Sequence, residues 1–85
     1  MATWIKTDGT VTEVQPKNGT DFKLDELQRY VGGYIELLTL TNFRYMVVNE
    51  EGKVSGLPLN VKASAIYRFD AIVGDVLICK VEEIK

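Results

Sequence analysis

An 85-residue chain with 46% apolar and 26% charged residues is long enough for one small globular domain and too apolar for a disordered tail. Its net charge of −2 argues against general nucleic-acid binding, and no apolar run approaches the roughly 20 residues of a membrane span. The chain contains no histidine, which removes Ser-His and Cys-His nucleophile pairs and most zinc sites.

The chain begins with two β-prone runs, Trp4–Lys6 and Val11–Gln15. Asp8-Gly9 lies between them, and this dipeptide is a strong hairpin-turn signal. The next residues, Pro16–Thr20, are typical of a loop. The sequence therefore predicts an N-terminal β-hairpin followed by a loop.

A short helix is predicted next, because three apolar residues follow helical spacing: Leu24, Leu27 and Val31. Asp25 and Glu26 fall in its first turn, where carboxylates complement the helix dipole. Gly32-Gly33 could cradle a phosphate, but phosphate loops precede helices and this pair follows one. We interpret the pair as the helix stop, since glycine adopts the left-handed conformation there.

The clearest strands are Tyr34–Leu40 and Arg44–Val48, connected as a hairpin. Apolar residues occur on both faces of the first, which favours a central strand of the sheet. Glu36 is the only charge within it. It either faces solvent or forms an ion pair across the hairpin with a residue such as Arg44.

The C-terminal part is predicted to contain a second short helix and a last strand. Asn60 is a good N-cap for a helix over Val61–Arg68, with Ala65 and Ile66 facing inward. The last strand is expected over Val76–Val81. The element order is then ββαββαβ, and the fold class is α+β, a single domain over residues 1–85 with a mainly antiparallel sheet and two short helices.

Cys79 falls in this last strand, where we expect a small buried hydrophobe. A single cysteine excludes an internal disulfide and suits a reducing cytoplasm. No residue pattern calls for a metal or a cofactor, and we expect neither.

Two polar turns between apolar runs, Asn49–Lys53 and Gly56–Asn60, are the best candidates for a binding site. They could equally be a solvated turn and a helix cap. In a ligand site, the asparagines would hydrogen-bond the ligand, the cations would neutralise a phosphate at the start of the second helix, and a tyrosine would stack. The predicted ligand-binding residues are Tyr34, Arg44, Asn49, Lys53, Asn60 and Lys62.

Several blocks of the chain resemble one family in order: Phe22, Leu24, Leu27-Gln28, Val31–Glu36, Asn49–Lys53, Gly56–Asn60, Ala63 and Ile72–Asp75. The pattern is similar to that of an uncharacterised family of small domains common in bacteriophages and bacterial mobile elements. Lys23 departs from it, because the family pattern suggests a threonine N-cap at this position. The resemblance implies no activity, only a small protein of the host cytoplasm.

We therefore expect a non-enzymatic accessory protein that sequesters a small polar, nucleotide-type ligand as a homo-oligomer, with a counter-defence role. The alternative is a protein–protein inhibitor or adaptor that binds a host protein through an acidic surface or a strand edge. An enzyme that uses carboxylates or tyrosine ranks third, because no acid–base constellation is visible. We expect neither nucleic acid nor a membrane as partner.

Overall fold

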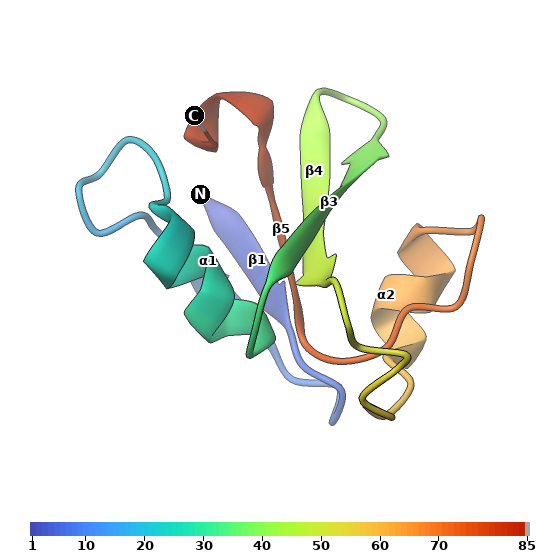
Figure 1. The fold of residues 1–85 in the computed structure, drawn as a ribbon. Coiled ribbons are helices and arrows are strands. Elements are labelled where there is room, and N and C mark those ends of the chain that lie inside the picture. Colours follow the sequence, from blue (N-terminus) through green and yellow to red (C-terminus); the bar gives the residue numbers. More distant parts are fainter. Residues whose placement is uncertain (85) are drawn as a thin grey trace.

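Five strands form one antiparallel sheet in the order β2-β1-β5-β4-β3. The computed structural model describes residues 1–84 (Figure 1). Its elements are β1 (Ala2–Ile5), β2 (Val11–Val14), α1 (Leu24–Val31), β3 (Ile35–Leu40), β4 (Arg44–Asn49), α2 (Val61–Ile66), β5 (Val76–Lys80) and the 3-10 helix η1 (Val81–Glu83). The predicted α+β class and the ββαββαβ order are confirmed.

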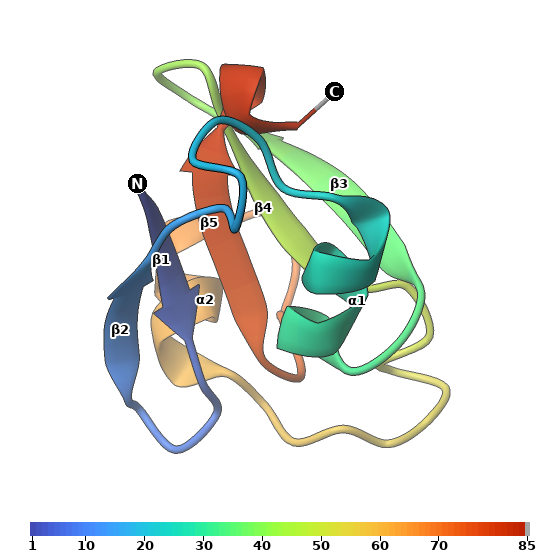
Figure 2. The same cartoon turned by 90° about the vertical axis from the view of Figure 1, so that its left-hand side faces the viewer.

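Helix α1 covers one face of the sheet, as Figure 2 shows from the side. Leu27 and Val31 are buried there in one cluster with Val47, Leu77 and Cys79 from the two central strands. Burial raises the pKa of the Cys79 thiol to about 12, so the thiol stays protonated near neutral pH. The prediction of a small buried hydrophobe is confirmed.

The ends of α1 are set by local contacts. Lys23 occupies the N-cap position and makes no side-chain cap hydrogen bond. The buried Glu26 instead ties the start of the helix to the preceding loop, because its carboxylate accepts from the N–H of Lys23 at 3.1 Å and of Lys17 at 3.0 Å. Gly32 ends the helix at φ 81°, and its N–H donates to Gln28 O at 2.8 Å. The helix-stop interpretation of the glycine pair is therefore confirmed.

Helix α2 lies on the opposite face, where the wholly buried Ala63 packs with Met46, Val76 and other residues of a second cluster. The prediction that Ala65 and Ile66 face inward is wrong, because both are exposed. The helix is only six residues long, and its first turn, held by Asn60, presents Ala63 to the sheet.

Strand β3 lies at the edge of the sheet, so the prediction of a central position is wrong. An apolar pattern on both faces does not reveal which neighbours a strand has. Of the two alternatives for Glu36, the ion pair with Arg44 is not formed, because the hairpin register places Glu36 opposite Val48 and Arg44 opposite Leu40. Glu36 is exposed, as the alternative interpretation expected.

Candidate functional site

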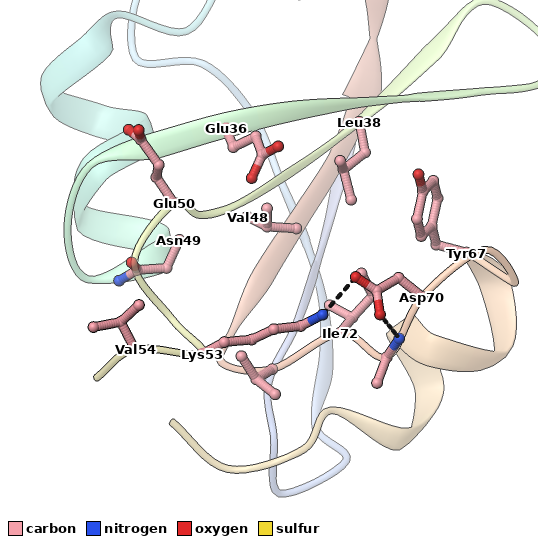
Figure 3. Close-up of a pocket in the computed structure, with 12 residues that line it drawn as sticks. Glu36, Leu38, Val48, Asn49, Glu50, Lys53, Val54, Tyr67, Asp70 and Ile72 are labelled. Atoms are coloured by element: carbon pink, nitrogen blue, oxygen red, sulfur yellow. Dashed lines mark hydrogen bonds and ion pairs between the residues drawn. The ribbon is translucent and has the colours of Figure 1, made fainter. Parts of the chain in front are cut away.

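A groove of about 270 Å³ lies between the β3–β4 hairpin and the chain that follows α2 (Figure 3). We call it the β3–α2 groove. Its lining includes Glu36, Leu38, Val48, Lys53, Asp70 and Ile72. Leu38, Val48 and Ile72 form apolar walls, and the charged side chains lie around them. The groove is therefore amphipathic, as small-molecule sites commonly are.

One ion pair connects the two sides of the groove. Lys53, from the turn after β4, donates to a carboxylate oxygen of Asp70, whose other oxygen accepts from Ala71 N–H at 2.8 Å. These contacts, with that of the Lys53 ammonium first, lower the pKa of the Asp70 carboxyl below its ordinary value. Both side chains are more than half exposed, at 56% and 59%, so a ligand can reach them.

The exposed Lys53–Asp70 ion pair should make the titration of Asp70 depend on Lys53. Replacing Lys53 with methionine removes the main cause of the lowered pKa, and the pKa of Asp70 should rise toward its ordinary value. Carboxyl chemical shifts followed by NMR across acid pH measure this. Because the pKa of Asp70 is lowered in the folded state, the pair is formed at neutral pH and is lost as the pH falls through that pKa. An unchanged titration in the variant would contradict the pairing.

Carboxylates outnumber cations in the lining of the groove. Glu36, Glu50 and Asp70 contribute negative charge, and Lys53 is the cation among the lining residues. This balance favours ligand groups that donate hydrogen bonds over a deeply bound phosphate.

The structure does not bring the predicted cations together. Arg44 begins β4 and lines a separate hollow beside Phe69. Lys62 points to the β1–β2 turn, where its ammonium donates to Gly9 O at 2.8 Å. Of the three predicted cations, Lys53 alone belongs to the β3–α2 groove.

Asn49 also lines the groove, but its amide is used within the fold. Its Nδ2 donates to Val31 O at 3.2 Å, and its Oδ1 accepts from Glu51 N–H at 2.9 Å. Tyr34 is 66% exposed and lines a neighbouring hollow that shares Asn49. Asn49 therefore lines the groove with its amide already committed, Tyr34 lines the neighbouring hollow, and neither forms the predicted cluster with Lys62 and Arg44.

Asn60 is a structural residue, and the prediction that it contacts a ligand needs correction. Its side chain is 1% exposed. Its Nδ2 donates to Ile5 O at 3.0 Å and Gly74 O at 2.9 Å, and its Oδ1 accepts from Ala63 N–H at 3.1 Å. The N-cap prediction is confirmed, whereas both amide hydrogens and the amide oxygen are committed inside the protein.

Sequence patterns do not predict that Asp70, Leu38 and Ile72 line the groove. Asp70 is 17 residues from Lys53, and no periodicity connects the two positions. Leu38 and Ile72 read as ordinary core residues, because apolar periodicity does not distinguish a core wall from a groove wall. Within the described residues, no group of three or more potential metal ligands was found, and no helix is long and apolar enough to cross a membrane.

The family model described as "Domain of unknown function (DUF3846)" matches residues 4–85. No curated protein and no solved structure matches the chain. The match covers almost the whole chain and agrees with the expected resemblance to an uncharacterised family of small domains. The chain belongs to the DUF3846 family, whose function is unknown.

Proposed function

We propose that this chain is a non-enzymatic protein that binds a small polar ligand of nucleoside or nucleotide type in the β3–α2 groove. The observation that carries the proposal is the lining of the groove, which combines apolar walls with a few exposed charges. Its volume of about 270 Å³ suits a ring system rather than a macromolecule. A flat base would lie against Leu38 and Ile72, while its polar edge would meet the charged side chains.

The charge balance suggests how such a ligand would be oriented. The exposed carboxylates of Glu36 and Asp70 can accept hydrogen bonds from the amino groups of a base. They would repel a phosphate, so the phosphate would point outward, toward Lys53 at the rim. When the ligand binds, Lys53 would leave Asp70 and pair with the phosphate. This exchange is possible because the side chains of both Lys53 and Asp70 are accessible to solvent.

The wider context of the proposal rests on the family resemblance and on composition. In this context, a small protein of a phage or mobile element would sequester a nucleotide signal in the host cytoplasm. Such a protein would need to bind the nucleotide but not to convert it. The absence of histidine and the protonated, buried thiol of Cys79 support binding over nucleophilic catalysis. We further propose that the protein acts as a homo-oligomer.

The proposal is tested by titrating the ¹⁵N-labelled chain with adenosine, cytidine, guanosine, their 5′-monophosphates and a cyclic dinucleotide. We expect amide shifts at Leu38, Val48 and Ile72. In Lys53→Met, nucleotide affinity should fall about 3- to 10-fold, equivalent to ~1 kcal/mol for an exposed charged contact, while nucleoside affinity should change little.

Lys62→Met is the matched control, because this lysine is also exposed but lies against the β1–β2 turn. Its nucleotide affinity should equal that of the parent. The proposal would be wrong if no member of the panel shifted the groove amides. Equal losses of nucleotide affinity in Lys53→Met and Lys62→Met would instead show that the ligand binds outside the groove.

The open edge of β3 favours a second candidate, an adaptor or inhibitor that adds a strand of a host protein to this sheet. This candidate makes no use of the groove. It competes with self-association at the same edge, because a dimer formed through β3 would leave no free edge for a strand of a host protein.

A further inference from the structure

The outer edge of β3 has unpaired backbone groups. On its inner side, Tyr34 O accepts from Glu50 N–H at 2.8 Å, which continues the β3–β4 ladder. Because hydrogen-bonding direction alternates along a strand, the groups of Ile35, Leu37 and Thr39 point to the other side. The described chain places no strand there.

This edge lacks the features that usually prevent strands from pairing. β3 contains no proline and no lysine, and Glu36 is its single charge. The α1 face of the strand carries Ile35 and Leu37, and the α2 face carries Leu38 and Leu40. Leu37 is 39% exposed in the single chain. The edge therefore offers unpaired backbone groups beside apolar side chains, which is the surface on which another strand can pair.

We propose that a second copy of this chain pairs antiparallel with β3 and joins the two sheets into one. The two-fold axis passes between Leu38 and Leu38 of the second copy, perpendicular to the sheet. Leu37 then lies opposite Thr39 of the second copy, and Glu36 opposite its Leu40. All these pairs keep each face of the sheet continuous, because opposite residues in antiparallel strands point to the same face.

Charge complementarity favours this register. It also favours a second copy of this chain as the strand that pairs with the open edge of β3. In the sheet, Leu40 lies beside Arg44, and Arg44 beside Lys80, all in one row. Glu36 of the second copy enters this row, about 10 Å from the Arg44 backbone, which two long side chains can bridge. Within the described residues, neither Glu36 nor Arg44 has an ion-pair partner.

The neighbouring register, centred on Leu37, lacks this complementarity. It would place Glu36 of the second copy opposite Leu38, in an apolar row with Met46 and Ile78. A lone carboxylate there would gain no partner. In the register centred on Leu38, two Glu36–Arg44 pairs form, related by the two-fold axis.

This dimer specifies the homo-oligomer of the proposed function and forms without a ligand. The axis is perpendicular to the sheet, so both β3–α2 grooves open on the same face, on either side of the two Leu38 residues. Glu36 and Leu38 belong to both the groove and the dimer, whereas Lys53, Asp70 and Ile72 line the groove away from the paired edge. Failure of the dimer is therefore measured without ligand, and failure of ligand binding is measured at Ile72 and with the Lys53→Met variant.

Sedimentation equilibrium of the ligand-free chain tests the dimer directly. We expect a monomer–dimer equilibrium at micromolar concentrations. Glu36→Arg and Arg44→Glu should each raise the dissociation constant at least about tenfold, because each sets like charges against one another twice per dimer. The double variant should restore the parent value to within roughly threefold.

Two further variants test the paired edge: Thr39→Pro blocks it, and Glu13→Arg is the control. Proline at Thr39 removes an N–H at the open edge, so the dimer should be lost while the amide spectrum of the fold is retained. Glu13 is an exposed glutamate on β2, the opposite edge strand, and its charge reversal should leave dimerisation unchanged. A monomeric parent at 100 µM, on the order of 100 times a micromolar dissociation constant, would overturn the proposal. So would a dimer that survives Thr39→Pro, and failure of the double charge variant to recover would overturn the register.

Disulfide trapping provides a second measure of the register. Facing Leu38→Cys side chains would lie in a pair with Cα atoms about 4.5 Å apart, within disulfide range. Leu38→Cys should cross-link on mild oxidation and Thr41→Cys should not. The native Cys79 adds no background because it is 1% exposed and protonated. A cross-link at Thr41 without one at Leu38 would overturn the assigned pairing.

Discussion

Replacing Asn60 with alanine should lower the free energy of unfolding by about 3 to 5 kcal/mol. The change leaves the buried carbonyl groups of Ile5 and Gly74 without their donor and removes the cap that accepts from Ala63 N–H. A buried group left unsatisfied costs about 1–3 kcal/mol, and loss of an N-cap about 1 kcal/mol. Urea denaturation followed by far-UV circular dichroism measures the difference.

Asn60→Asp sharpens this prediction. Aspartate keeps the capping oxygen but removes both donors and places a carboxylate among buried carbonyl oxygens, so its loss of stability should equal or exceed that of the alanine variant. Val61→Ala is the control, because Val61 is 68% exposed in the same helix, and it should change stability by less than about 0.5 kcal/mol. A loss below about 1 kcal/mol in Asn60→Ala would contradict the structural role of this side chain.

Leu77→Ala should be comparably damaging, with a loss of about 2–5 kcal/mol. Leu77 is wholly buried in β5, the middle strand, between Trp4 of β1 and Val47 of β4. Truncation leaves a cavity beneath α1 that the strands on both sides prevent from collapsing.

Leu24→Ala is the matched control for this change. Leu24 starts α1 and is 59% exposed, so its truncation should cost less than about 1 kcal/mol in the same urea experiment. If the two leucine variants lost equal stability, the position of β5 at the centre of the sheet would be in doubt.

The elements could be predicted from the sequence because their signals are local. The Asp8-Gly9 turn, the glycine stop of α1 and the Asn60 cap each act within a few residues, and all three are present. Sheet order depends on which strands meet, and an apolar pattern does not encode it. The pattern therefore predicts a central position for β3, whereas the strand lies at the edge.

The site was only partly predictable for the same reason. The polar turn predicts Lys53 as a binding residue, but its partner Asp70 is 17 residues away. The polar turn Gly56–Asn60 predicts Asn60 as a ligand contact as well as an N-cap, and the cap accounts for one of its three side-chain hydrogen bonds. The other two go to Ile5 and Gly74, 55 and 14 residues distant, and no local pattern predicts them.

Native mass spectrometry of the chain purified gently from a bacterial host would show whether the protein carries a small ligand. We expect an adduct of nucleoside or nucleotide mass that is lost on denaturation, retained in Lys62→Met and reduced in Lys53→Met. A parent protein that carries no adduct and acquires none from the nucleotide panel would contradict ligand binding. An adduct held equally by both variants would contradict its assignment to the β3–α2 groove.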